Sequence, residues 1–267
     1  MNKWLRLGLI IFFSATFLFS AYMLGSYYWE SNKQQAQFDE LAEMVRMATP
    51  TTPDGKPVAQ PEPDGQLGTS QSPEASQTLP QYVEVAKLNS HMIGWITIDG
   101  TKINYPVMQT PDSPDYYLKR DFYKNYSGHG CLYVREQCDV DAPSDNITIY
   151  GHNMKDGSMF ADLLNYQRKS YWENHRYVTF DTLNAHHTYE VFAVFTTTGT
   201  KGKGFQYHQF VDAKSEDDFY EFIKDCQDLS FYSTGITPQY GDKLITLSTC
   251  EYTQTNGRFV VVARCIS

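Results

Sequence analysis

The chain has 267 residues, 41% of them hydrophobic, and a formal net charge of −9. This length fits one folded domain of ordinary size together with additional segments. Nucleic-acid binding needs clustered lysine and arginine side chains to neutralise phosphates, and no such cluster occurs in this acidic sequence. We therefore exclude nucleic acid as a partner.

An apolar segment near the N-terminus has the length of a membrane-spanning helix. Residues 7–28 are almost uncharged, and 22 residues at about 1.5 Å each cross the roughly 30 Å hydrocarbon core of a bilayer. Lys3 and Arg6 precede the segment, so the positive-inside rule predicts a cytoplasmic N-terminus. A cleaved signal peptide is the alternative, but no small-x-small cleavage site occurs late in the segment. We predict that residues 1–29 are a cytoplasmic tip and a retained single-pass anchor in the cell membrane, with everything after Glu30 outside.

Residues 30–80 connect this anchor to the folded domain. Phe38, Leu41 and Val45 recur at spacings of three and four, which predicts a short helix continuing outward. Residues 49–80 then contain seven prolines among Gly, Ser, Thr and Gln. Such a composition cannot bury enough apolar surface to offset the entropy of ordering. We predict a juxtamembrane helix followed by a flexible tether that holds the domain off the membrane.

Residues 81–267 have the pattern of a mainly β domain. A short helix is expected around residues 83–88. Eight strand-like runs follow, at residues 95–98, 103–108, 131–135, 146–150, 177–181, 188–197, 243–250 and 258–264. Short strands separated by turn residues predict a closed barrel or a sandwich.

Two further helices are expected between these strands. Residues 158–166 place four large apolar side chains on one side of a helix. Residues 215–229 begin with Ser215 and Asp218, a variant of the capping box in which Asp replaces the usual Glu. Both segments would lie outside the β-sheet.

The segment 244–264 has the pattern of a β-hairpin. Two β-branched, apolar flanks are joined by a short polar link that contains glycine. Side chains alternate along a strand, so Thr246, Ser248 and Cys250 share one face. If Arg258 lies opposite Cys250, the two project from the same face with Cβ atoms about 4.5–5.5 Å apart. The pattern therefore predicts a thiol beside a cation that cannot lose its proton.

Three segments, taken in order, resemble a known family. They are Asn104-Tyr105-Pro106-Val107, Ile149-Tyr150-Gly151-His152-Asn153-Met154, and Thr246-Leu247-Ser248-Thr249-Cys250 followed by an arginine that opens a valine-rich strand. The set is similar to the sortases, transpeptidases of Gram-positive cell surfaces, and the resemblance extends from about residue 82 to the C-terminus. Ser248, Glu251 and the helical insert at 215–229 favour class B. The resemblance implies an eight-stranded sortase-type β-barrel with a few peripheral helices.

The resemblance also assigns catalytic residues. A transpeptidase needs a nucleophile, a group that both gives and accepts a proton, and donors for an oxyanion. Cys250, His152 and Arg258 match these roles in that order, and backbone amides near residue 251 would supply a second donor. The alternatives are a packing role for Cys250 and a catalytic role for His129 in place of His152. Arg264 shares the face of Arg258 but lies six residues along the strand, so we expect it in a surface salt bridge.

Five further positions match residues that line or support the peptide groove of class B enzymes: Asn104, Met108, Tyr150, Ser248 and Glu251. Each has an ordinary alternative as a barrel-wall or loop residue. The link between Cys250 and Arg258 is two residues shorter than is usual in class B, which leaves the shape of the groove open. No calcium-type loop of Asp, Asn and Gly occurs, and the prediction includes neither a metal site nor a cofactor.

Five cysteines occur, at positions 131, 138, 226, 250 and 265. An odd number leaves at least one thiol unpaired within the chain. In the predicted hairpin Cys265 lies about 20 Å from the position opposite Cys250, so these two cannot form a disulfide. Cys131 and Cys138 could bridge a turn, and two separate semi-buried thiols are an equal alternative.

The sequence as a whole predicts an anchored class B sortase. By resemblance, such an enzyme cleaves an NPxT(N/G)-type sorting signal after threonine through a Cys250 thioester, and joins the surface protein to a cell-wall amine of peptidoglycan or lipid II. Its substrates would be surface proteins with NPxTN-like or LPxTG-like sorting signals, and polymerisation of pilin subunits is a related alternative. Two rivals remain, a hydrolytic surface cysteine peptidase and a catalytically silent surface binding domain.

Overall fold

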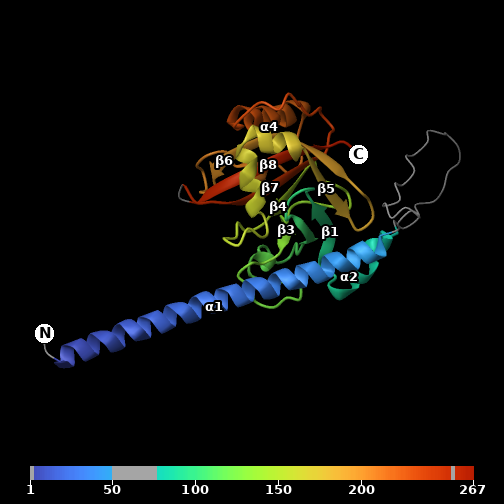
Figure 1. Ribbon diagram of the computed structural model, residues 1–267. Helices are drawn as coiled ribbons and strands as arrows, with labels where there is room; N and C mark the ends of the chain where they lie inside the picture. Colours follow the sequence, from blue (N-terminus) through green and yellow to red (C-terminus); the bar gives the residue numbers. More distant parts are fainter. Residues whose placement is uncertain (1–2, 50–76, 254–255) are drawn as a thin grey trace.

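The computed structural model describes residues 3–49, 77–253 and 256–267, and a closed β-barrel forms its centre (Figure 1). The strands are β1 (Met92–Thr97), β2 (Asn104–Met108), β3 (Leu132–Val134), β4 (Asn146–Tyr150), β5 (Tyr177–Thr182), β6 (Thr188–Thr198), β7 (Leu244–Glu251) and β8 (Gly257–Cys265). They pair in the order β1-β2-β3-β4-β7-β8-β6-β5, and β5 closes the barrel against β1. The predicted eight-stranded barrel is confirmed.

Helical segments surround the barrel: α1 (Lys3–Ala48), η1 (Pro80–Tyr82), α2 (Val83–Leu88), η2 (Tyr116–Lys119), η3 (Ala161–Gln167), α3 (Lys169–Asn174), η4 (Tyr207–Gln209) and α4 (Glu216–Leu229), where η marks a 3₁₀-helix. The predicted insert is α4, and the Ser215 hydroxyl accepts the Asp218 N–H at 3.2 Å as a cap. The Asp218 carboxylate accepts the N–H of Lys214, not that of Ser215, so the capping box is incomplete.

The helix expected at residues 158–166 is present as the 3₁₀-helix η3, but it begins three residues later, at Ala161. Met159 has a backbone φ of 57°, which an α-helix cannot contain. The Ser158 N–H and hydroxyl both donate to the Asp156 carboxylate, at 2.9 and 2.6 Å. These local bonds hold the chain in a turn, so the helical segment begins only after Phe160.

Two pairs of neighbouring strands run parallel, β2 with β3 and β4 with β7. In the second pair Tyr150 lies opposite Ser248. Parallel strands end at the same rim of a barrel, so the residues that follow Tyr150 and Ser248 leave the sheet together. The topology thus joins two segments that are about one hundred residues apart in sequence.

The hairpin β7–β8 has the predicted register, with Cys250 opposite Arg258. By alternation Leu244 lies on the face of Cys250 and Val260 on the face of Arg258. Both apolar residues belong to a cluster on the outer surface of the barrel beneath α4 (Figure 1). Cys250 and Arg258 therefore face outward, not into the barrel core.

Helix α1 differs from the expectation in its packing. The predicted span and the predicted juxtamembrane helix form one continuous helix, whose second half lies along the barrel (Figure 1). Phe38 and Leu41 are buried in the same core as the barrel interior, and the Phe38 ring lies 5.0 Å from the Tyr105 ring. The first half of α1 is exposed and is long and apolar enough to cross a membrane. Most of the predicted tether, residues 50–76, lies outside the described residues.

Candidate active site

His152 and Cys250 leave the barrel at one rim because β4 and β7 are parallel. The Gly151 N–H donates to the Ser248 carbonyl at 3.1 Å, which extends the strand pairing one residue beyond β4. Gly151 is closely packed, since a Cβ atom there would lie 2.3 Å from Leu132 Cδ2. His152 therefore follows a position where only glycine fits.

One cavity contains the three predicted catalytic residues. Its volume is about 70 Å³, and its lining residues are Leu118, Tyr133, Tyr150, Gly151, His152, Ser248, Thr249, Cys250 and Arg258. Strand β7 supplies Cys250, β8 supplies Arg258, and the turn after β4 supplies His152. The structure brings together the three side chains that the sequence singled out.

The His152 ring is held by the backbone of the 3₁₀ segment η2. Its Nε2 atom lies 2.7 Å from the carbonyl oxygen of Leu118. A carbonyl only accepts hydrogen bonds, so Nε2 carries the proton and donates it. This bond fixes the tautomer and leaves Nδ1 as the nitrogen that can accept a proton.

The Arg258 guanidinium is held at the end of the hairpin. Its Nη1 donates to the Gly257 carbonyl at 3.0 Å and to the Asn256 carbonyl at 3.4 Å. The backbone of Gly199 approaches so closely that a Cβ atom there would lie 3.2 Å from Arg258 Cζ. Because both carbonyl bonds use Nη1, the N–H groups on Nε and Nη2 can serve a substrate.

The rival arginine lies elsewhere. Arg264 is opposite Leu244, at the far end of β7 from Cys250. Its guanidinium nitrogens lie 3.2 Å from the Glu190 carboxylate and 3.8 Å from that of Asp242. Arg264 is thus in the salt bridges that the sequence predicted.

A groove continues from the cavity that contains Cys250, His152 and Arg258. It has a volume of about 350 Å³, shares Leu118, Tyr133, Tyr150 and Arg258 with that cavity, and adds Pro114, Asp115, Arg135, Glu136, Gly199, Tyr207 and His208. Burial, and then the cations of Arg135 and Arg258, lower the pKa of His208 below its usual value. His208 is therefore a neutral wall residue near pH 7, and the groove offers an extended, mixed polar surface beside the thiol.

The other thiols are poor nucleophiles. Burial raises the pKa of Cys131, Cys138, Cys226 and Cys265, which favours their unreactive protonated form. All five cysteines are unpaired, so of the two alternatives for Cys131 and Cys138 the structure has two separate thiols. Cys250 alone among the five lines the cavity that contains His152 and Arg258.

Comparison with known proteins identifies the family. The sortase domain family matches residues 96–266. Sortase B of Staphylococcus aureus is 31% identical over 189 residues, which cover 70% of this chain and 75% of that protein. Sortase B of Listeria monocytogenes is 28% identical over 270 residues, which cover 100% of this chain and 99% of that protein. The chain is a class B sortase.

Solved structures agree with this assignment. Sortase B from Bacillus anthracis in complex with AAEK1 has a TM-score of 0.71 and 29% identity, covering 90% of this chain and 99% of that chain. The Staphylococcus aureus sortase B–substrate complex has a TM-score of 0.72 and 26% identity, covering 89% and 98%. The sortase is accordingly a cysteine transpeptidase.

Three of the predicted groove residues lie at or beside the cavity of this sortase. Tyr150 lines both the cavity and the groove. Ser248 lines the cavity, but its hydroxyl is buried and lies 2.6 Å from the Tyr207 hydroxyl. The Glu251 carboxylate accepts the N–H and hydroxyl of Thr253, at 2.7 and 2.8 Å. Ser248 thus supports the floor of the site, and Glu251 shapes the turn that follows Cys250.

The other two predicted groove residues, Asn104 and Met108, lie apart from this cavity and groove. Neither lines the cavity or the groove. Asn104 begins β2 at the end opposite Met108, and its side-chain oxygen accepts the Trp95 indole N–H at 2.6 Å. Met108 is fully buried in the core.

His129, the rival of His152, is buried beside α1. Its Nε2 lies 2.8 Å from Asp156 Oδ2, and its side chain is only 4% exposed. The Asp156 carboxylate also accepts the hydroxyl of Ser31 in α1. His129 therefore contributes to the contact between α1 and the barrel of the sortase, and it does not line the cavity that contains Cys250.

Sequence reasoning missed several residues of the site. Tyr207 and His208 lie in the irregular connection between β6 and α4, where no periodic pattern marks them. The Leu118 carbonyl acts through its backbone, which no side-chain pattern reveals. Asn153 stood within the His152 segment without an assigned role, yet its side chain contacts the backbone of Cys250. Its position next to His152 was the sequence feature that could have indicated a role for Asn153.

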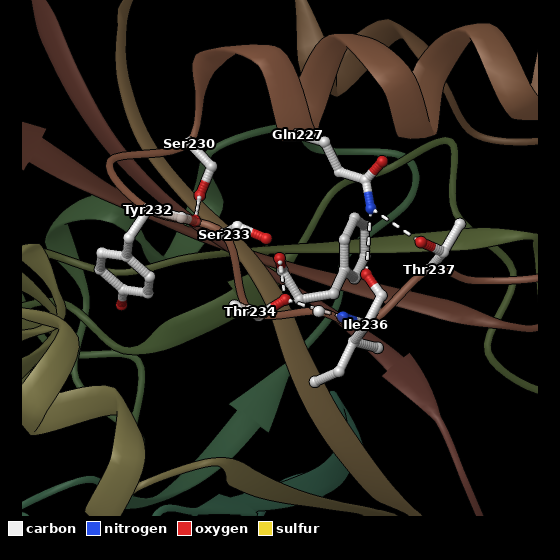
Figure 2. Close-up of a pocket in the computed structure, with 9 residues that line it drawn as sticks. Gln227, Ser230, Tyr232, Ser233, Thr234, Ile236 and Thr237 are labelled. Atoms are coloured by element: carbon white, nitrogen blue, oxygen red, sulfur yellow. Dashed lines mark hydrogen bonds between the residues drawn. The ribbon is translucent and has the colours of Figure 1, made fainter.

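A separate cavity of about 320 Å³ lies between the end of α4 and the loop 230–237 (Figure 2). Several of its polar groups bond to one another or to nearby backbone. Gln227 donates to the Ile236 carbonyl and to the Thr237 hydroxyl, and Thr234 donates to the Phe192 carbonyl. None of the predicted catalytic residues lines it. Across residues 3–49, 77–253 and 256–267, no three His, Cys, Asp or Glu side chains come together to hold a metal ion.

Proposed function

We propose that this sortase is a membrane-anchored transpeptidase that cleaves an NPxT(N/G)-like sorting signal after threonine and transfers the surface protein to a cell-wall amine. The observation that carries the proposal is the common cavity of Cys250, His152 and Arg258, which opens into an extended groove. A nucleophile, a proton carrier and a fixed cation at the end of a peptide-sized groove suit acyl transfer from a peptide.

The first half-reaction forms a thioester. The Cys250 thiolate attacks the threonine carbonyl carbon, and the electron pair of the C=O bond moves to the oxygen, where Arg258 donates to the oxyanion. When the C=O bond re-forms, the C–N bond breaks and the leaving amine takes a proton from Nδ1 of the His152 imidazolium. The products are a threonyl thioester, neutral His152 and a free amine.

The second half-reaction reverses the proton transfer. An incoming amine attacks the thioester carbonyl carbon and gives a proton to Nδ1 of His152, which has become a base. The C–S bond then breaks, and the thiolate and imidazolium are restored. Leu118 supports both steps, because its carbonyl keeps Nε2 as the protonated nitrogen throughout.

The groove beside Arg258 is the proposed site of the sorting signal. The Staphylococcus aureus sortase B structure with bound substrate and a sortase B complexed with triglycine support a peptide donor and an amine acceptor. For this chain we propose peptidoglycan or lipid II as the source of that amine. Tyr150 is kept as a substrate-binding residue because it lines both cavity and groove.

Mass spectrometry of the enzyme during turnover of a motif peptide tests this mechanism. The threonine-ended half should appear as an adduct on Cys250, and hydroxylamine or a glycine amine should speed its release and enter the product. Cys250→Ala should give neither adduct nor product. An adduct on another cysteine would refute the assignment, and product formed only with water would favour a hydrolytic peptidase.

We further propose that residues 7–28 span the cell membrane with the N-terminus inside, and that residues 81–267 form the external catalytic domain. The apolar first half of α1 and the Lys3/Arg6 pair support this orientation. Protease added to intact protoplasts should cut within residues 47–80 and yield a fragment near the size of 81–267. Protection of that segment until the membrane is breached would reverse the orientation.

A further inference from the structure

The contact between α1 and the barrel begins where the proposed membrane span ends. The Tyr27 ring stacks against the ring of His129, with centroids 6.5 Å apart. One turn further along α1, the hydroxyl of Ser31 donates to the carboxylate of Asp156. From this level onward the barrel lies against the helix, so no length of bare helix separates the barrel from the end of the span (Figure 1).

The aromatic residues of α1 mark the depth of this contact. Tyr27, Tyr28 and Trp29 end the apolar segment 7–28, and the last two are exposed. Tyrosine and tryptophan gather at the boundary between the hydrocarbon core and the headgroups. Ser31 follows Tyr28 by three residues, which is a rise of about 4.5 Å along a helix. Each headgroup layer is about 5–7 Å thick, so Ser31 lies within that layer.

Three exposed lysines lie at the same level. Lys155 directly precedes Asp156, and the ammonium of Lys102 donates to the backbone carbonyl of Asp156 at 3.2 Å. On α1 itself, the ammonium of Lys33 lies 5.7 Å from the centroid of the Trp29 ring. Two separate parts of the barrel and one turn of α1 therefore present cations at the depth of the lipid phosphates.

The carboxylates at this level face the protein. Glu30 accepts the N–H of Gly128 at 3.3 Å, and Asp162 accepts the backbone N–H of Lys102 at 2.8 Å. Asp156 accepts hydrogen bonds from Ser31, Ser158 and His129. The chain as a whole has a net charge of −9, so a surface that exposes its lysines and turns its carboxylates inward is a local exception. Lysine ammoniums at the membrane surface attract anionic lipid headgroups.

We propose that the surface formed by Lys33, Lys102 and Lys155 rests on the phosphate headgroups of the outer leaflet. This inference rests on the proposed membrane span of residues 7–28. The packing of α1 brings the surface to the bilayer, and the three lysines bind the anionic headgroups there. This arrangement differs from the expectation that residues 49–80 hold the domain off the membrane.

The turn that contacts the membrane also carries His152. His152 precedes Asp156 by four residues, so at most about 14 Å of chain separates them. The cavity that contains His152 and Cys250 is therefore held near the headgroup layer. An amine that is attached to a membrane lipid would lie close to the proposed thioester.

Fluorescent labels at three positions of the full chain in phospholipid nanodiscs test this placement. Cys250→Ala and Cys265→Ser remove the two thiols that are not buried, and a nitrobenzoxadiazole fluorophore is then attached at Gly128→Cys, where the added side chain meets open space. A nitroxide on the lipid headgroups should quench this label at least about threefold more than the same label at Lys224→Cys. Lys224 is exposed on α4, which lies on the side of the barrel away from α1 (Figure 1). A third label, at Phe17→Cys, should be quenched by a nitroxide in the acyl chains.

Lipid charge tests the role of the lysines. Quenching of the Gly128→Cys label at low salt should be about twofold greater when the nanodiscs contain phosphatidylglycerol than when they contain phosphatidylcholine alone. Salt at about 1 M should remove the difference, because it screens exposed charges. Replacing Lys33, Lys102 and Lys155 together by Gln should also remove it. Replacing Lys87, Lys214 and Lys224 by Gln, which are exposed lysines elsewhere on the domain, should leave it unchanged.

The outcomes separate this inference from the proposed span. An unquenched label at Phe17→Cys would refute the span and this inference with it. A quenched label there, with the label at Gly128→Cys quenched no more than that at Lys224→Cys, would keep the span and overturn this inference. Equal quenching with and without phosphatidylglycerol would overturn it as well, since the lysines would then bind no anionic headgroup. That comparison uses the natural lysines, so it decides the matter even if the triple variant does not fold.

Discussion

The close packing of Gly151 makes a sharp prediction about how His152 is placed. In Gly151→Ala, the added Cβ would lie 2.3 Å from Leu132 Cδ2 and 2.6 Å from Phe160 Cδ2. Both neighbours are fully buried and cannot turn into solvent. Ordinary contact begins at 3.4 Å, so the chain must move by about 1 Å.

The magnitude follows from that shift. Overpacking of a core costs about 1–3 kcal/mol in the free energy of unfolding. A displacement of about 1 Å in a reacting group costs about 100-fold in rate. Because His152 is the next residue and must keep its bond to Leu118, we expect Gly151→Ala to lose about 1–3 kcal/mol and about 100-fold in kcat/KM.

Urea unfolding and cleavage of a motif peptide by the full chain in detergent measure the two effects. Gly128→Ala is the matched control, because a Cβ there meets no atom within 4 Å. It should leave both quantities unchanged. If Gly151→Ala kept wild-type stability and turnover, the residues around position 151 would be able to accommodate a methyl group, and His152 would not be fixed by this packing.

Three further predictions concern the arginines, the docked helix and pH. Arg258→Lys should keep the fold and lose most turnover, because an ammonium lacks the planar fork of donors, whereas Arg264→Lys should be nearly silent in the same peptide assay; equal losses would contradict the assignment. Leu41→Ala, which empties a fully buried site, should lower the free energy of unfolding by about 2–5 kcal/mol, and Met47→Ala, at a site 72% exposed, should change it by less than about 0.5 kcal/mol. Burial raises the pKa of Asp156, but hydrogen bonds from Ser158, Ser31 and His129 outweigh burial and hold that pKa well below the ordinary value. The stability that ionised Asp156 contributes is therefore fully present above its unfolded pKa of about 3.9 and is lost progressively as the pH falls. The urea concentration at the unfolding midpoint should therefore decrease when the pH is lowered below about 5 in the wild type. The decrease should be less steep in Asp156→Asn.

The hairpin of β7 and β8 could be predicted because its register depends on residues that are close together in sequence. Alternation along two strands and a short link fix which residues share a face, so Cys250 opposite Arg258 and a remote Arg264 followed from spacing. The position of His152 needed the family resemblance, because the parallel pairing of β4 with β7 joins segments that no local pattern connects. The number of strands was predictable from the apolar runs and the turn residues between them.

The groove and the packing of α1 could not be predicted, because both depend on contacts between segments that are distant in sequence. Tyr207 and His208 reach the site through an irregular connection, and Asn104 matches the family but points its amide at Trp95. The spacing of Phe38 and Leu41 indicated an apolar face on a helix, but it did not indicate which part of the protein packs against that face. Local bonds at Asp156 likewise delay the start of the helix expected at 158–166 to Ala161.

The packing of α1 against the barrel limits how the barrel can move relative to the first half of that helix. Between residues 26 and 48 the helix contains neither glycine nor proline, and its second half is packed into the core, so no hinge separates the apolar half from the barrel. If residues 7–28 lie in the bilayer, as proposed, this rigid connection holds Cys250 at one height above the membrane and in one orientation, whatever the length of residues 50–76. The scissile bond of a substrate must then reach that height, so the spacing between a sorting signal and its own membrane anchor would affect which substrates are cleaved.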